Sequence, residues 1–171
     1  KEVNSGRMNL GVVTVNLPRI ALEAQGDKEL FWQIFQEKMN ICHTALKYRI
    51  ARTKQAKPEN APLLYMYGAF GKRLKRTDSV DEVFKNSRAT ISLGYIGLYE
   101  VCTTFYGSNW EHNKEAHDFA VSIAKAMHEL CAKWESEEGY HYSLYSTPAE
   151  SLTDTFCQDD LKKFGRIEDV T

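Results

Sequence analysis

Short apolar runs along the chain alternate with long stretches of helical periodicity. Runs rich in β-branched and aromatic residues lie at residues 10–17, 89–93 and 142–146, and each predicts a strand. The first run is apolar enough for a strand that is covered on both faces. Residues 63–67 form a further short run that also predicts a strand.

Two long stretches repeat apolar residues at intervals of three and four positions, which is typical of amphipathic helices. The first begins after Gly26, with Asp27 as its expected N-cap, and continues to about residue 54. The second begins near Asn113 and is expected to end at Gly139. Shorter helices are predicted over residues 78–85 and 98–106.

Each of the three main strands is expected to lead into a helix. Pro18 ends the first strand and can occupy the first turn of a helix. After the third strand, Thr147 is the expected N-cap, Pro148 lies in the first turn and Glu150 completes a capping box. This last helix is expected to end near residue 156. The repeated strand–helix order predicts parallel strands with long helical crossovers, an α/β fold.

Length and composition narrow the class of protein and leave the predicted α/β fold unchanged. The chain has 171 residues, enough for one domain with a core, and a formal net charge of −1. A net charge this close to zero argues against a nucleic-acid partner. No apolar run has transmembrane length and no signal peptide is recognisable, which predicts a soluble, cytoplasmic protein without a membrane partner. The basic run at residues 72–76 is expected to be an exposed loop, with binding of phosphate or of an acidic partner as the alternative.

The four cysteines are widely spaced and form no CxxC pair: they are Cys42, Cys102, Cys131 and Cys157. Zinc sites are usually built from close pairs, and disulfides are rare in cytoplasmic proteins, so neither is expected here. Most of these thiols are expected to be buried and inert, since Cys42 and Cys131 fall on apolar helix stripes. His117 and His128 lie about 16 Å apart along one helix, too far to share a metal ion.

Residues 146–151 are the strongest candidate for a binding site. A helix that begins just after a strand directs free N–H groups and a partial positive charge outward, which suits a phosphate. The hydroxyl groups of Ser146, Thr147 and Ser151 can add hydrogen bonds. The alternative is an ordinary helix cap without a ligand.

Polar groups and glycines near the first two strands are weaker candidates. Asn9 and Asn16 lie in or beside the first run, where their amides need partners, either protein groups or a ligand. Gly94 and Gly97 permit close approach of a ligand or of a neighbouring element. Their spacing is not that of a dinucleotide-binding fingerprint. Ser92 could line the same pocket or serve packing alone.

Four segments together resemble the anaerobic, class III glycyl-radical ribonucleoside-triphosphate reductases. They are residues 6–13 (GRMNLGVV), 16–21 (NLPRIA), 88–100 (RATISLGYIGLYE) and 143–152 (SLYSTPAESL), in the order that the family has. The resemblance implies a ten-stranded α/β barrel around a central finger loop. Family members are several times longer and both ends of this chain look truncated, so residues 1–171 are expected to form a single, incomplete segment of that barrel domain.

The resemblance also implies roles for the candidate residues. Asn9 would lie beside the substrate ribose, where aerobic relatives carry a glutamate, and the turn after the third strand would hold the substrate phosphates. Substrate binding is thereby expected at Asn9, Ser92, Gly94, Ser146, Thr147, Pro148, Ala149, Glu150 and Ser151. No catalytic residue is expected in this segment, because the family's thiyl-radical cysteine lies upstream and its radical glycine and four-cysteine zinc site lie downstream.

The implied activity is the anaerobic reduction of ribonucleoside triphosphates to deoxyribonucleoside triphosphates for DNA synthesis. A glycyl radical generates a thiyl radical that takes hydrogen from the ribose 3′ carbon, the 2′ hydroxyl leaves as water, and formate is the reductant. Further implied cofactors and partners are a structural zinc, nucleotide effectors, a radical-SAM activating enzyme and a second copy in a homodimer. This segment itself is expected to bind no cofactor and to be inactive alone.

Two other functions stay open on the sequence alone. One is another glycyl-radical enzyme, of the formate-lyase or dehydratase kind, against which the phosphate-type turn at residues 146–151 argues. The other is a non-catalytic nucleotide-binding or scaffold module, because no complete catalytic set is present. Flanking sequence would discriminate, since a reductase carries a finger cysteine upstream and CxxC pairs with a radical glycine downstream.

Overall fold

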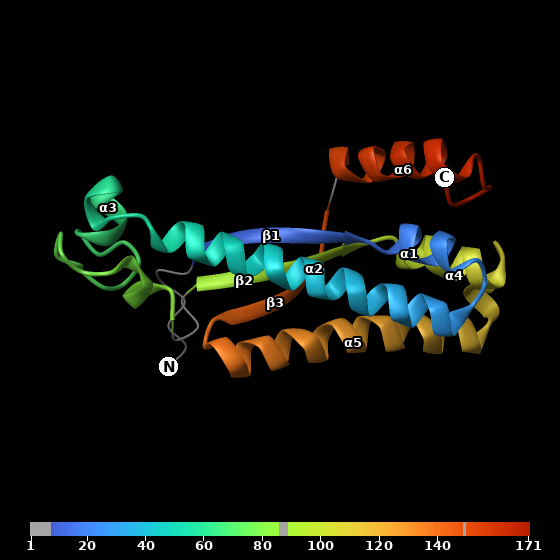
Figure 1. Ribbon diagram of the computed structural model, residues 1–171, viewed down its shortest axis with the longest axis horizontal. Helices are drawn as coiled ribbons and strands as arrows, with labels where there is room; N and C mark the ends of the chain where they lie inside the picture. Colours follow the sequence, from blue (N-terminus) through green and yellow to red (C-terminus); the bar gives the residue numbers. More distant parts are fainter. Residues whose placement is uncertain (1–7, 86–88, 149) are drawn as a thin grey trace. The chain divides into compact units, whose positions relative to one another are not determined.

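Three parallel strands form the sheet of the part of the chain that the structure describes. The structure, a computed structural model, describes residues 8–85, 89–148 and 150–171. Strands β1 (Met8–Asn16), β2 (Ala89–Ile96) and β3 (His141–Ser146) pair in the order β1-β2-β3 and run in the same direction (Figure 1). Because parallel neighbours need long crossover connections, helices join them. The predicted α/β class is confirmed.

The helices of the described residues are α1 (Leu17–Ala24), α2 (Lys28–Lys54), α3 (Pro62–Tyr65), α4 (Leu98–Tyr106), α5 (Lys114–Glu138) and α6 (Glu150–Phe164), with short 3-10 segments at Pro58–Asn60, Val80–Val83 and Trp110–His112. The carboxylate of Asp27 accepts from the N–H groups of Glu29 and Leu30. Asn113 accepts from the N–H of Glu115 at 2.9 Å. The N-cap predicted at Asp27 is therefore confirmed, and the second long helix begins next to Asn113 as predicted. None of these helices is long and apolar enough to cross a membrane.

The described residues group into two compact units. The first draws on Lys1–Val13, His43–Leu93 and Glu129–Leu144, and the second on Thr14–Cys42, Gly94–His128 and Tyr145–Thr171. Each unit therefore receives residues from all three strands and from both long helices, α2 and α5.

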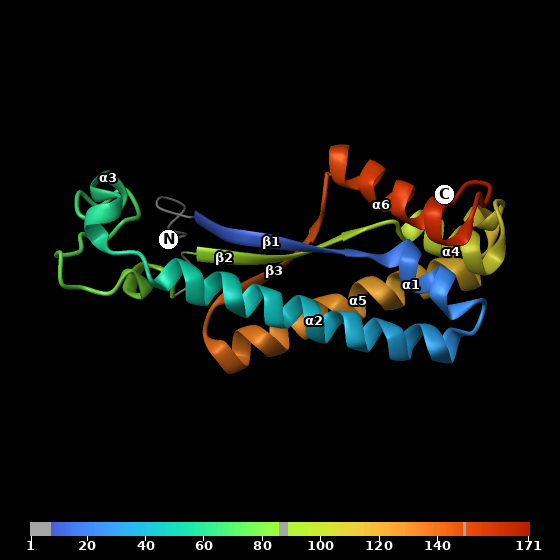
Figure 2. The same cartoon turned by 45° about the horizontal axis from the view of Figure 1, so that its top comes forward.

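In the first unit, α2 and α5 pack on one face of the strands (Figure 2). The ring of His43 on α2 stacks on Trp134 of α5, with ring centroids 4.2 Å apart. Tyr142 of β3 meets both rings edge-on. Glu138 on α5 accepts from the Tyr142 hydroxyl and lies 2.6 Å from Nε2 of His43. One aromatic and polar cluster thus joins two helices to the edge strand β3.

In the second unit, α1 packs against α4 at a position that requires glycine. Gly97 precedes α4 with a φ of +89°, and a β-carbon there would overlap the ring of Pro18 at the start of α1. The close approach that Gly97 permits is therefore one of a neighbouring element. An aromatic cluster of Phe31, Phe35, Phe105 and Phe119 fills the space between the helices of this unit.

The last helix differs from the prediction at both ends. Helix α6 begins at Glu150, so Thr147 is not its N-cap and Pro148 does not lie in its first turn. The N–H of Thr147 donates to the carbonyl of Tyr95 on β2 at 3.2 Å, so Thr147 continues the pairing of the strands instead of capping the helix. The helix also continues past residue 156 to Phe164.

Two local predictions between α2 and β2 are wrong in detail. Residues 63–67 are not a strand, because Pro62 starts the short helix α3 and its carbonyl accepts from the N–H of Met66 at 2.8 Å. The helix expected over residues 78–85 is a 3-10 segment, Val80–Val83, capped by the Ser79 side chain. The basic run at residues 72–76 is exposed apart from Leu74, as expected of a loop.

Candidate functional site

Asn9 lies on β1 in the first unit, and its side chain is fixed by two partners. Its carbonyl Oδ1 accepts from the N–H of Gly11 at 2.8 Å, and its amide nitrogen Nδ2 donates to Ser92 Oγ at 3.4 Å. Ser92 in turn lies 2.9 Å from the hydroxyl of Ser143 on β3. The structure thus brings together two predicted site residues, Asn9 and Ser92, and joins a third side chain to them.

Ser143 was not among the predicted site residues. Tyr142 is buried on the face of β3 that packs on α5, and side chains along a strand alternate between faces. Ser143 must therefore point away from that helix, to the side where Ser92 lies. Period-two alternation within residues 142–146 could have indicated this residue once the strand was predicted.

The predicted phosphate-binding turn lies in the second unit, between β3 and α6. Ser146, Pro148 and Ser151 are exposed, whereas Thr147 is half-buried. The Thr147 hydroxyl lies 3.1 Å from that of Thr14 on β1. Ala149 and the side chain of Glu150 are outside the described residues. The turn therefore presents exposed hydroxyls, but the N–H and hydroxyl of Thr147 already have protein partners.

Gly94 is buried in β2 of the second unit, next to the strand residue whose carbonyl accepts from Thr147. The strand is thus covered at this position.

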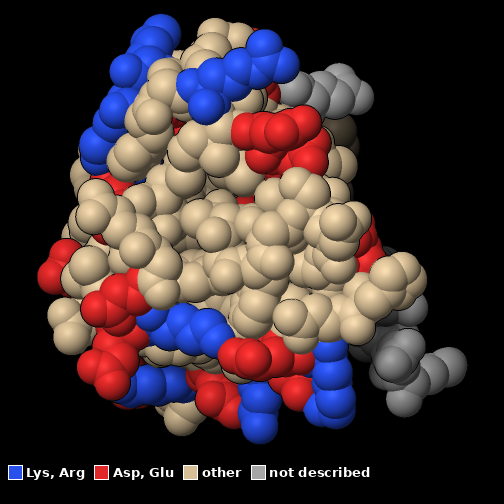
Figure 3. All heavy atoms as spheres, turned by 90° about the vertical axis from the view of Figure 1, so that its right-hand side faces the viewer, with Lys and Arg blue, Asp and Glu red and all other residues tan. Residues whose placement is uncertain are grey.

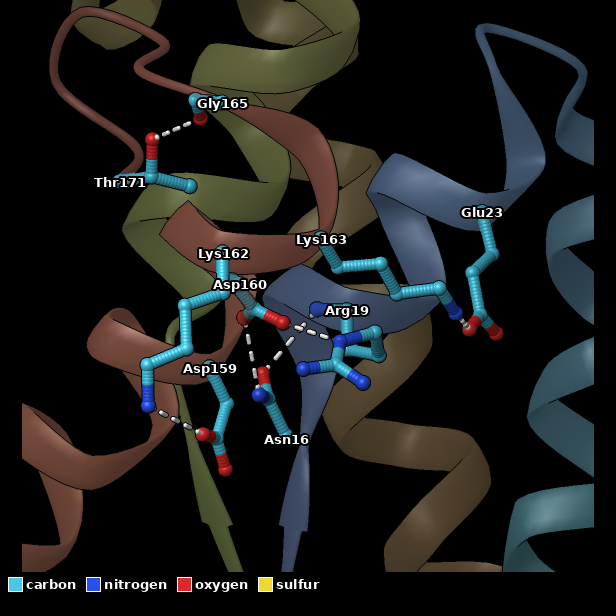
Figure 4. A network of polar contacts seen from close by, with 9 residues as sticks. All are labelled: Asn16, Arg19, Glu23, Asp159, Asp160, Lys162, Lys163, Gly165 and Thr171. Carbon is cyan, nitrogen blue, oxygen red and sulfur yellow. Dashed lines mark hydrogen bonds and ion pairs between the residues drawn. The ribbon is translucent and has the colours of Figure 1, made fainter.

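A buried carboxylate ties α6 to the end of β1. Asp160 is 2% exposed, and it accepts from Nδ2 of Asn16 at 2.9 Å and from Nε of Arg19 (Figure 4). Asn16 also caps α1, because its Oδ1 accepts from the N–H of Arg19 at 3.0 Å. The amide of Asn16 therefore has protein partners, as in the alternative without a ligand. Lys163 adds an exposed ion pair to Glu23 of α1.

Charges are mixed in sign on the face that Figure 3 shows. Lys and Arg lie beside Asp and Glu around its rim, and uncharged residues occupy its middle. A surface of this kind produces no field of a single sign, which a polyanion such as nucleic acid would need for steering.

A family model described as anaerobic ribonucleoside-triphosphate reductase matches residues 1–171. The chain belongs to this family. It is 45% identical to the anaerobic ribonucleoside-triphosphate reductase of Salmonella typhimurium over all of this chain, and 42% identical to that of Enterobacteria phage T4 over 99% of it. Those matches cover 24% and 27% of the relatives, so the chain spans about a quarter of their length.

Solved structures of anaerobic reductases share the fold. The anaerobic ribonucleotide reductase of Thermotoga maritima with citrate in its active site matches with a TM-score of 0.72 at 26% identity, covering 94% of this chain and 30% of that one. The same enzyme in complex with dATP and CTP matches with a TM-score of 0.71 at 26% identity, covering 94% and 27%. Family membership decides against the formate-lyase and dehydratase alternatives.

The cysteines of this reductase segment fit the prediction of buried thiols. Cys42, Cys102 and Cys131 are buried, Cys157 is partly exposed, and all four are free. Burial raises the pKa of the Cys42 and Cys131 thiols to about 11 and also raises the pKa of Cys102. Within the described residues, no three metal-ligating side chains gather in one place.

Thiol labelling should separate Cys157 from the other three cysteines. At pH 8 a thiol with a pKa of about 11 is a reactive thiolate for only about one part in a thousand. An aromatic disulfide reagent should therefore label Cys157 in the folded protein and all four thiols in denaturant, as measured by absorbance and peptide mass. The Cys157→Ser variant is the control and should lose the fast phase. Fast labelling of Cys42 or Cys131 in the folded protein would contradict the prediction.

Proposed function

We propose that this chain is the part of an anaerobic ribonucleoside-triphosphate reductase that binds and orients the ribonucleotide substrate. The observation that carries the proposal is the match of the whole chain, at 42–46% identity, to curated enzymes of this name. Complexes of the Thermotoga maritima enzyme with dATP and CTP support a nucleotide as the ligand.

The ribose contact is proposed for Asn9. Its side chain is exposed on β1, yet its amide is oriented by Gly11 and Ser92. An oriented amide can donate to or accept from a ribose hydroxyl without taking up a proton at neutral pH. Ser92 is proposed to line the same substrate site, and Gly94 is proposed as a further substrate contact.

The phosphate contacts are proposed for the turn before α6, with Ser146, Thr147, Pro148, Ala149, Glu150 and Ser151. Exposed hydroxyls at Ser146 and Ser151, beside the N-terminus of a 15-residue helix, support this role. The partial positive charge of a helix N-terminus stabilises an anion. Thr147 would have to share its hydroxyl between Thr14 and the ligand.

Radical chemistry is proposed for other parts of the longer enzyme. The glycyl radical would generate the thiyl radical that takes hydrogen from the ribose, with formate as the reductant. Three of the four cysteines here are buried with raised pKa values, which disfavours the thiolate that a metal site needs. A structural zinc likewise finds no cluster of ligands among the described residues. The segment's own task is to bind and position the substrate.

The wider assembly is also part of the proposal. The three parallel strands with long crossovers suit one section of a ten-stranded α/β barrel. Nucleotide effectors, a radical-SAM activating enzyme and a homodimer are the proposed partners, and the cytoplasm is the proposed location.

The phosphate site can be tested by Thr147→Val combined with Ser151→Ala in the full-length protein. Loss of two hydroxyl donors to a charged phosphate should raise KM for the ribonucleoside triphosphate about tenfold or more, with little change in kcat. Steady-state kinetics and equilibrium binding of the triphosphate measure this effect.

Two controls define the outcome of this test. Thr155→Val removes a hydroxyl one turn further along α6, where it donates to the carbonyl of Ser151. Thr14→Val removes the same Thr14–Thr147 bond but leaves the hydroxyl of Thr147 in place. Neither control should change substrate affinity by as much. Unchanged affinity in the double variant would contradict the phosphate assignment.

A further inference from the structure

Three side chains form a continuous polar chain across the sheet in the first unit. Asn9 on β1 contacts Ser92 on β2, and Ser92 contacts Ser143 on β3. Ser92 is 4% exposed, whereas Asn9 is exposed. A buried hydroxyl therefore supports an accessible amide.

The direction of donation along this chain follows from chemistry. The N–H of Gly11 can only donate, so the Asn9 atom that it meets at 2.8 Å has to be the carbonyl oxygen. Nδ2 of Asn9 then faces Ser92 and donates to its oxygen. Ser92 Oγ lies 2.9 Å from Ser143 Oγ and either hydroxyl can donate; in both cases Ser92 can accept from Asn9, because a hydroxyl oxygen has two lone pairs.

This orientation leaves the second N–H of Asn9 at the exposed end of the polar chain. An amide nitrogen carries two hydrogens, and Ser92 takes one of them. The terminal torsion of an asparagine is otherwise broad, so an amide without fixed partners would present nitrogen and oxygen interchangeably. The hydrogen bonds to Gly11 and Ser92 therefore hold the second N–H of Asn9 in one direction.

We propose that Ser92 and Ser143 are positioning residues that hold the Asn9 amide with its second N–H directed at the substrate. The inference rests on the proposed ribose contact of Asn9 and specifies it: Asn9 acts as a donor, and a ribose hydroxyl oxygen is the acceptor. Ser143 acts through Ser92, because its hydrogen bond to the Ser92 hydroxyl fixes the position of the oxygen that accepts from Asn9.

The test uses Ser92→Ala and Ser143→Ala in the full-length protein. Freeing the amide should raise KM for the ribonucleoside triphosphate about fivefold for Ser92→Ala and about twofold for Ser143→Ala, with kcat unchanged. Ser143→Thr keeps the hydroxyl and should restore the KM of the unmodified protein. Thr90→Val is the matched control, since its hydroxyl lies on the same strand but donates to the carbonyl of Met8.

A double-mutant cycle separates positioning from a general structural role. If Ser92 acts through Asn9, Ser92→Ala should not raise KM further in an Asn9→Ala background. Additive effects, or a rise in KM for Thr90→Val equal to that for Ser92→Ala, would overturn the inference. Thermal unfolding of each variant identifies loss of fold, and the partly exposed Ser143 then carries the test.

The same variants test the ribose contact of Asn9 separately from the positioning role of Ser92. An unchanged KM in Asn9→Ala would overturn the ribose contact itself, and with it the inference. A raised KM in Asn9→Ala together with an unchanged KM in Ser92→Ala would leave the ribose contact standing and overturn only the positioning role.

Discussion

Asp160→Ala is expected to lower the free energy of unfolding by about 3 kcal/mol, the typical effect of removing one partner of a buried ion pair. The substitution leaves the guanidinium of Arg19 and the amide of Asn16 without their acceptor in a site where the carboxylate was 2% exposed. Denaturant unfolding followed by circular dichroism measures the change. Because Asp160 joins α6 to the β1–α1 junction, α6 should also become more accessible to protease.

Asp159 provides the matched control for this prediction. It is the preceding residue on α6, and its carboxylate is exposed in an ion pair with Lys162 at 3.5 Å. Exposed pairs of this kind contribute about 0 to 1 kcal/mol, so Asp159→Ala should change stability little. Asp160→Asn should lie between the two, since it keeps one acceptor oxygen but loses the charge. Equal effects of the Asp159 and Asp160 substitutions would show that burial of the carboxylate is unimportant.

Gly97→Ala should destabilise the protein by about 3 kcal/mol or more, because two costs add at this position. A φ of +89° disfavours any β-carbon, and that carbon would overlap the ring of Pro18. Relief of the overlap would require α1 and α4 to separate, with loss of their packing. Thermal and urea unfolding of the variant measure the effect.

Gly107→Ala isolates the conformational part of this effect. Gly107 ends the same helix with a φ of +84°, and no atom lies within 4 Å of a β-carbon built there. Only the backbone conformation is then penalised, by about 1 to 3 kcal/mol, because a φ of +84° with a ψ of 173° is a region that is essentially confined to glycine. A larger loss of stability for Gly97→Ala than for Gly107→Ala therefore reports the overlap with Pro18. No difference would mean that α1 and α4 do not approach as closely as the structure describes.

Local sequence signals predicted most of the elements but fewer of their ends. The caps at Asp27 and Asn113 and the glycines after α4 and α5 act within a few residues, and these boundaries agree with the structure. The start of α6 does not agree. The N–H of Thr147 pairs with Tyr95, a residue 52 positions earlier, and a contact of this range leaves no local trace.

The residues of the candidate site were likewise predictable one by one, but their long-range partners were not. Sequence reasoning selected Asn9, Ser92 and the turn at residues 146–151 one segment at a time. It gave no reason to link Ser143 to Ser92, or Asp160 to Asn16, since these partners are 51 and 144 residues apart.

By itself, the sequence determined the α/β class, the parallel strands with long helical crossovers and, through four motif segments, membership of the reductase family. Periodicity and capping depend on residues that are close along the chain, and a sequence motif can be recognised without the structure. The tertiary structure alone decided which side chains complete one another, namely the carboxylate that holds α6 and the hydroxyl chain behind Asn9. Those partners meet only after the strands pair, because hydrogen bonds act over about 3 Å in space irrespective of distance along the chain.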